Sequence, residues 1–199
     1  RLVGSEMCIR DSIKKDIELL SSQVERCNEI LKRLTLNPVE EDEFIDKDLS
    51  MKDYLSEIIS SFKEISQKKF VFNYDQFSNL KKITKSIEIV YGLRNFIGNA
   101  NKFSNETIYL TLKSDSEITE ITIEDDGNGY PKDVLSKIGE PYLRTKDPIE
   151  KTKTGLGLGL FIGKTLLEKN FASINCRNSK TRGGAEAIIK WNNKDLFNI

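Results

Sequence analysis

Three polar side chains, Asn95, Asn99 and Lys102, are spaced so that they share one face of a helix. Residues at positions i, i+4 and i+7 lie on the same side of an α-helix. The amide oxygen of Asn99 is a hard ligand that suits Mg²⁺, an ion that stays partly hydrated and bridges phosphates. Lys102 can reach a phosphate as a point charge. Taken alone, the pattern is also typical of a solvated polar face, so its chemistry depends on further motifs.

Two glycine-rich segments follow. Asp125 stands where a strand is expected to end, and Gly127 and Gly129 after it permit positive φ and close backbone approach to a ligand. An Asp-Gly pair is also typical of hairpin turns, but a loop of roughly 25 residues follows here in place of a partner strand. The second segment, TGLGLGL at 154–160, is expected to open a helix and to deliver free N–H groups to phosphates.

Two familiar phosphate-binding motifs do not fit the second segment. No strand precedes it, and its third glycine falls too early for a dinucleotide-binding fingerprint. Gly163-Lys164-Thr165 has the ending of a P-loop, but that motif requires a glycine at the position of Leu158. Gly163 and Lys164 are expected inside a helix instead.

In order and separation, the three segments resemble the N, G1 and G2 boxes of the GHKL superfamily of ATP-binding domains. Gly139-Glu140-Pro141-Tyr142 lies between G1 and G2, where histidine kinases carry their F box. The resemblance implies ATP and Mg²⁺ as cofactors and Asn99 as the metal ligand. It implies a binding site made of Asn99, Lys102, Phe103, Asp125, Gly127, Gly129, Tyr142, Thr154, Gly155, Gly157, Leu158 and Gly159.

Within this implied site, Asp125 would accept the exocyclic amine of adenine. Phe103 could pack on the adenine ring, although a core position suits it equally. Arg144 and Lys146 could approach the γ-phosphate and stabilise charge that develops during transfer. The alternative for these two is a pair of solvated loop charges.

Asn95 separates the two chemistries of the superfamily. Gyrase-like, Hsp90-like and mismatch-repair ATPases carry a glutamate four residues before the magnesium asparagine, where it activates water. This chain has Asn95 at that position, and an amide cannot act as a general base at neutral pH. The sequence therefore favours phosphoryl transfer to a protein side chain, with Asn95, Asn99, Lys102, Arg144 and Lys146 as the catalytic candidates.

Periodicity predicts the elements that position these residues. Ser50 and Asp53 form a capping-box-like start for a helix that continues to about residue 62. A second helix is expected at 86–103 and a third at 158–170. Strands are expected at 69–74, 107–113, 118–124, 172–179 and 185–191, and a long loop at 127–153. The predicted fold is α+β, a mixed sheet with helices on one face, and the catalytic domain is assigned to 49–195.

The first 48 residues have a different character. Residues 1–12, RLVGSEMCIRDS, resemble a translated sequencing adapter, and the alternative is a disordered native terminus. Apolar residues in 13–36 recur at steps of four and three, as in a helix bundle that needs a partner helix or second subunit. An acidic linker is expected at 37–48.

Two further stretches, QVERCNEIL at 23–31 and GLGLFIGKTLLE at 157–168, resemble the RegB/PrrB/ActS group of redox-responsive sensor kinases. The resemblance implies that 13–36 is the second helix of a homodimeric phosphoacceptor domain. The phosphoaccepting histidine and any inner-membrane sensor are then expected upstream, which agrees with the absence of histidine from the sequence. A response-regulator receiver domain is the implied downstream partner.

Composition limits the remaining possibilities. The formal charge is zero, so nucleic acid is not an expected partner. No apolar run reaches the 18 or so residues that cross a bilayer, and three cysteines form no disulfide pattern, so a cytoplasmic location is expected. Cys27 lies on the bundle seam, as a buried small hydrophobe or alternatively as a redox thiol. Cys176 is expected in the core.

Two alternatives to a histidine kinase remain open at this level. An anti-sigma-like serine kinase uses a similar ATP domain, although it lacks the dimerisation helix that 13–36 indicates. A non-catalytic ATP-responsive dimerisation module would bind Mg·ATP without labelling a partner.

Overall fold

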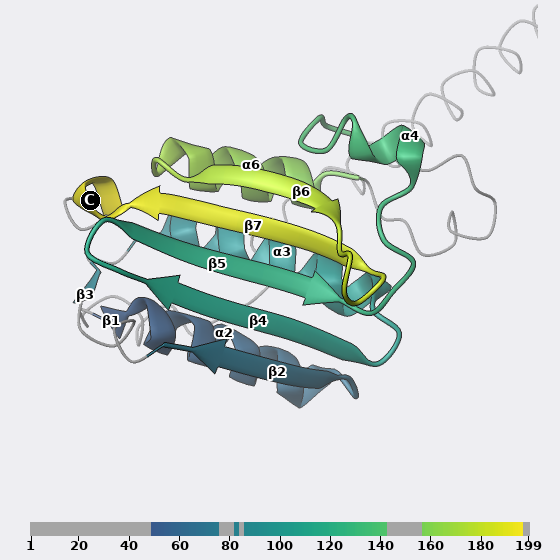
Figure 1. The fold of residues 1–199 in the computed structure, drawn as a ribbon, viewed down its shortest axis with the longest axis horizontal. Helices are drawn as coiled ribbons and strands as arrows, with labels where there is room; N and C mark the ends of the chain where they lie inside the picture. The colour runs from purple at the N-terminus through teal and green to yellow at the C-terminus, as the bar shows by residue number, and fades with distance from the viewer. Residues whose placement is uncertain (1–48, 76–81, 84–85, 143–156, 197–199) are drawn as a thin grey trace, which may run out of the picture. The chain divides into compact units, whose positions relative to one another are not determined.

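The computed structural model describes residues 49–75, 82–83, 86–142 and 157–196, all of which belong to one unit that spans Lys47–Ile199. The predicted bundle helix and linker, with Cys27, lie outside the described residues. A five-stranded sheet has the order β2-β4-β5-β7-β6, and three helices cover one of its faces (Figure 1). The predicted α+β architecture is confirmed.

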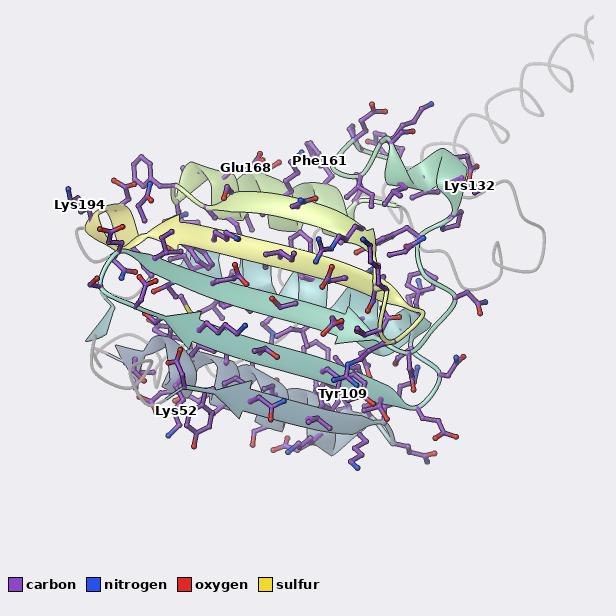
Figure 2. The ribbon with its side chains drawn as sticks, viewed as in Figure 1. Lys52, Tyr109, Lys132, Phe161, Glu168 and Lys194 are labelled. Atoms are coloured by element: carbon purple, nitrogen blue, oxygen red, sulfur yellow. The ribbon has the colours of Figure 1, made fainter. Side chains whose placement is uncertain are left out.

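The sheet is mixed. Strand β2 (Lys69–Tyr74) pairs parallel with β4 (Thr107–Ser114), whereas β5 (Ile118–Asp125), β7 (Ala185–Asn192) and β6 (Ser173–Asn178) follow in antiparallel pairs. The inner face carries alternate apolar residues that the helices bury. Figure 2 shows the opposite face, where Tyr109 projects from β4 and receives the guanidinium of Arg182 3.5 Å from its ring centroid.

The first covering helix, α2 (Met51–Ile65), begins at the predicted capping box. The Ser50 hydroxyl accepts the Asp53 N–H at 3.2 Å, and the Asp53 carboxylate accepts the Ser50 N–H at 3.2 Å. These reciprocal bonds satisfy two N–H groups that have no intrahelical partner. The helix also carries the small pair of β1 (Leu49–Ser50) with β3 (Lys82–Ile83), which the sequence did not predict because two-residue strands have no periodicity.

Helices α3 (Ile87–Phe103) and α6 (Gly159–Lys169) cross closely because each has a glycine at the contact. A Cβ added at Gly92 would lie 2.5 Å from Cγ of Leu167, and one added at Gly163 would lie 3.0 Å from Cβ of Asn95. Gly163 is therefore a helix-packing residue inside α6, as the sequence predicted, and the crossing brings the start of α6 to Asn95.

The core lies between the sheet and the three helices. Its largest fully buried side chains are Trp191, Tyr54, Leu55, Ile58, Leu93, Ile97, Ile108, Leu110, Leu112, Ile121 and Leu167. A short helix, α7 (Asn193–Leu196), ends the described chain directly after β7. None of the helices in the described ranges has both the length and the hydropathy to cross a bilayer.

Candidate functional site

The candidate residues gather at one end of the sheet, which we call the site end. Here β5 and β6 end, β4 and β7 begin, and α3 reaches its C-terminus, at the right of Figure 1. Antiparallel order places Asp125 of β5 beside Ile108 of β4. The sequence motifs that lie far apart along the chain are thus brought together by the register of three strands.

Asp125 is the buried centre of the site end, at 1% exposure. Its Oδ1 accepts the N–H of Gly127 at 2.9 Å and that of Ala185 at 3.1 Å. In the part of the chain that the structure describes, the protein makes no hydrogen bond to Oδ2. Burial raises the pKa of Asp125, and the two N–H donors oppose that shift without cancelling it. One carboxylate oxygen is therefore held by the protein and the other is available to a ligand donor.

Two glycines let the backbone approach Asp125 and its neighbours. A Cβ at Gly184 would lie 2.1 Å from the Asp125 carbonyl oxygen, and one at Gly127 would lie 2.2 Å from the Phe103 carbonyl oxygen. Gly127 does not adopt the positive φ that the sequence suggested, whereas Gly129 does, at 75°. Gly127 is required by contact with the end of α3 instead.

Asp126 joins the end of β5 to the start of β4. Its carboxylate oxygens accept the N–H groups of Asn105, Glu106 and Thr107 at 2.8 to 3.2 Å. The Asn105 side chain donates back to the Asp126 carbonyl at 2.6 Å. These bonds fix the C-terminal end of α3 against the glycine loop, so Asp126 positions the site although it is not expected to touch a ligand.

The predicted polar face of α3 is present. Asn95 donates its side-chain amide to the Tyr91 carbonyl at 2.8 Å, and its Oδ1 lies 3.5 Å from where a Cβ would stand on Gly159. Asn99 is half-buried, and within the described ranges its side chain makes no hydrogen bond. Lys102 is exposed, with Nζ 5.5 Å from the ring centroid of the half-buried Phe103.

The start of α6 faces Asn95. Gly157 has φ 70°, and Leu158 occupies the N-cap position without a side-chain hydrogen bond to the helix. Uncapped N–H groups at a helix start favour an anion. Gly157, Leu158 and Gly159 thus stand where the sequence expected them, whereas Thr154 and Gly155 lie outside the described residues.

The segment after the glycine loop differs in part from the predicted long loop. It contains a helical turn, α4 (Lys132–Leu135), because Pro131 fixes φ at −56° and its carbonyl accepts the N–H groups of Val134 and Leu135. Gly139, at φ 95°, packs on Lys164 of α6, where a Cβ would lie 2.4 Å from Cδ.

The other candidates on this segment are Tyr142, Arg144 and Lys146. Tyr142 is 58% exposed and adopts a left-handed φ of 61°. Arg144 and Lys146 lie outside the described residues. Their proximity to a phosphate stays a prediction.

Cys176 is half-buried beside Tyr130 and packs against the core, as expected. Burial raises the pKa of the Cys176 thiol to about 11 and that of the Tyr130 phenol well above its usual value. Both groups are protonated at neutral pH, and a thiol in that state is a poor nucleophile.

Sequence reasoning missed three residues of the site end: Asp126, Gly184 and Asn178. The glycine pair 183–184 could have indicated a close backbone contact. In the structure, Gly184 makes that contact, with Asp125. Asp126 and Asn178 form hydrogen bonds with backbone groups that are distant in sequence, and no local sequence pattern predicts such bonds.

Residues 84–194 match the family described as "Histidine kinase-, DNA gyrase B-, and HSP90-like ATPase". Sensor histidine kinase RegB of Cereibacter sphaeroides is 30% identical over 191 residues, which cover 89% of this chain and 40% of RegB. A putative NtrY-like sensor histidine kinase of Rickettsia bellii is 27% identical over 128 residues. The alignment with the latter covers 64% of this chain and 20% of the relative.

Solved structures support the fold. The nucleotide-free catalytic domain of histidine kinase ThkA superposes with a TM-score of 0.60 at 21% identity, over 72% of this chain and 95% of that one. The mycobacterial sensor histidine kinase MprB gives a TM-score of 0.59 at 19% identity, over 71% and 93% of the two chains. Full-length ShkA in complex with AMPPNP gives 0.60 at 19% identity, over 73% and 30%.

Proposed function

The chain belongs to the family of histidine kinase-, DNA gyrase B- and HSP90-like ATPases, and we propose that it transfers the γ-phosphoryl group of Mg·ATP to a histidine. It is a histidine-kinase-type ATPase domain homologous to sensor kinases of the RegB type. The chain spans 40% of the length of the RegB relative it matches, so the activity of the whole protein is part of the proposal.

Asp125 supports adenine as the base. Its Oδ1 accepts two backbone N–H groups, whereas none of the described residues donates to Oδ2, which could therefore accept a ligand donor such as the exocyclic amine. The backbone of the glycine loop lies close to Asp125, because Gly127 has no side chain to keep it away. Hydrogen bonds to a charged acceptor in a dry site are stronger than neutral ones.

The residues present fit Mg²⁺. Asn99 would hold the ion through its amide oxygen, since the side chain is half-buried and is not used in any hydrogen bond of the described ranges. A magnesium ion needs few protein ligands when phosphates and water supply the rest. Once bound there, Mg²⁺ would supply positive charge that neutralises the phosphates. Lys102 adds positive charge on the same helix face, and the N–H groups of the first turn of α6 would hold the phosphates.

The observation that favours phosphoryl transfer over ATP hydrolysis is the asparagine at position 95. Its amide nitrogen is committed to the Tyr91 carbonyl, and an amide oxygen cannot take a proton from water at neutral pH. Positioning and neutralisation are the contributions that the chain's own groups make to transfer. The acceptor histidine, a homodimer through residues 13–36, an inner-membrane anchor and a response-regulator partner belong to the proposed whole kinase.

The experiment mixes the chain with a separately purified dimerisation domain that bears the phosphoacceptor histidine of a RegB-type kinase. With Mg·[γ-³²P]ATP, we expect label on the partner that is stable to base and labile to acid. Asn99→Ala should abolish the label, and Asn73→Ala, on an exposed asparagine of β2, should leave it unchanged.

Two other outcomes of this labelling experiment would favour a different function. Label stable to acid would favour a serine kinase. Nucleotide binding of ordinary affinity without any label on a histidine-bearing partner would favour a non-catalytic module.

A further inference from the structure

Asn178, the last residue of the edge strand β6, bonds to a single residue 48 positions earlier. Its Oδ1 accepts the N–H of Tyr130 at 2.6 Å, and its Nδ2 donates to the Tyr130 carbonyl at 3.0 Å. The side chain thus satisfies both main-chain groups of Tyr130, as a neighbouring strand would. These two bonds also fix the orientation of the amide, because the reverse orientation would place donor against donor.

Gly129 is matched to this amide. It adopts φ 75°, and a Cβ there would lie 2.8 Å from Oδ1 and 2.9 Å from Cγ of Asn178. Asn178 therefore occupies the space that a side chain at position 129 would need. The glycine is required by its backbone conformation and by this contact together.

The loop 125–130 is consequently held at both ends. At its start, Asp125 accepts the N–H of Gly127, and at its end Asn178 holds Tyr130, whose ring is buried at 9% exposure. Pro131 and α4 follow at once, so the second attachment also fixes the point from which the segment 131–142 leaves the sheet.

We propose that Asn178 is a positioning residue for the base of the nucleotide, acting through the backbone of Gly129 and Tyr130. The inference rests on the proposed function, because it assumes that the loop 125–130 lines the adenine site. Asn178 itself touches no ligand. It keeps the loop backbone at the distance from Asp125 that the base requires.

The test uses titration calorimetry of the full chain with Mg·ATP and Mg·ADP, well below the unfolding temperature. Asn178→Ala should weaken the binding of ATP and ADP by the same factor, about tenfold, because the released loop must then be ordered when either nucleotide binds. Lys102→Ala should weaken ATP more than ADP, because it acts on the phosphates. Asn175→Ala, an exposed asparagine on the same strand, should change neither constant.

A double-mutant cycle with Gly129→Ala separates positioning from general stability. In the wild-type background the new Cβ meets Asn178, whereas in the Asn178→Ala background that obstacle is gone. The two losses of affinity should therefore combine to less than their product. Asn178→Asp keeps an acceptor for the Tyr130 N–H but sets a carboxylate oxygen against the Tyr130 carbonyl, so it should also weaken the binding of both nucleotides.

Unchanged affinities in Asn178→Ala, with only a lower unfolding temperature, would overturn the inference while leaving the proposed function intact. Strictly multiplicative losses in the cycle would overturn it as well. A wild-type chain that binds neither nucleotide would instead contradict the proposed function itself.

Discussion

The two ends of the sheet use buried polar residues in opposite ways. At the far end, Thr119 donates to the side chain of Asn193 at 2.7 Å, and Asn193 donates to the Asp115 carbonyl at 2.8 Å. At the site end, Asp125 receives two backbone bonds on one oxygen and none from the described residues on the other.

A second set of buried hydrogen bonds at the far end centres on Asn170. The Trp191 indole donates to the Asn170 carbonyl at 3.0 Å, and the Asn170 side chain accepts from Ser86 at 3.0 Å and donates to the Leu166 carbonyl at 2.9 Å. These bonds tie the start of α3 and the end of α6 to β7. Buried polar groups that are fully bonded specify a rigid arrangement.

From this difference we infer that the far end stabilises the fold, whereas ligand binding at the site end is our proposal. Burial raises the pKa of Asp125 above its ordinary value, so the ionised carboxylate is disfavoured in the folded chain. At neutral pH this carboxylate therefore lowers the stability of the fold. The cost begins to fall as pH drops through the raised pKa of the folded chain and is gone below the ordinary pKa of the unfolded chain. A ligand that donates to Oδ2 would offset the cost, which the saturated groups of the far end do not incur.

The largest effect is expected from Trp191→Ala. The substitution empties a site that is 1% exposed and leaves the Asn170 carbonyl without its donor, so the free energy of unfolding should fall by about 3–5 kcal/mol. Chemical denaturation measures this value, and calorimetry below the unfolding temperature should find nucleotide affinity unchanged.

Lys190→Ala is the neighbouring control, because its ion pair with Glu120 is half-exposed and should contribute about 0.5 kcal/mol or less. A large loss of nucleotide affinity in folded Trp191→Ala protein would contradict the inference that the far end contributes to stability and not to binding.

Gly184→Ala should damage the site end. Its Cβ would stand 2.1 Å from the Asp125 carbonyl, so the start of β7 must move, at a cost of about 1–3 kcal/mol in stability. Because the Ala185 N–H bonds to Asp125, that movement should also weaken Mg·ATP binding more than tenfold.

Gly183→Ala is the matched variant. Its Cβ would have no atom of the described residues within 4 Å, and its φ of 80° predicts a loss of about 1 kcal/mol in stability without a loss of affinity. Equal affinities for the two variants would contradict the role given to Gly184.

Most of the fold could be predicted from the sequence, because each helix and strand has its cap or its apolar periodicity within its own residues. The capping box at Ser50, the alternation in β4 and β5, and the helix that ends at Phe103 were all recovered close to their bounds. The helical turn at Pro131 was missed, because four residues carry no periodicity.

The candidate site could be predicted from the sequence where residue type carries the chemistry, as for Asp125 and Asn99, whose binding roles stay predictions. It was not predictable where a side chain acts on a distant backbone. Asp126 bonds to N–H groups about twenty residues away, and Asn178 to a residue 48 positions away. Such bonds depend on strand order, which single-strand patterns do not contain.

The most direct measurement is the dissociation constant of Mg·ATP for wild type and Asp125→Asn by titration calorimetry. An asparagine keeps an oxygen for Gly127 and Ala185 but places an amide donor where Oδ2 stood, so affinity for Mg·ATP should fall about 10- to 100-fold. The unfolding temperature should stay equal or rise, because a buried charge is removed. Asp133→Asn, an exposed acid on α4, controls for the charge change. An Asp125→Asn chain that binds Mg·ATP as tightly as wild type would contradict the assignment of the site end.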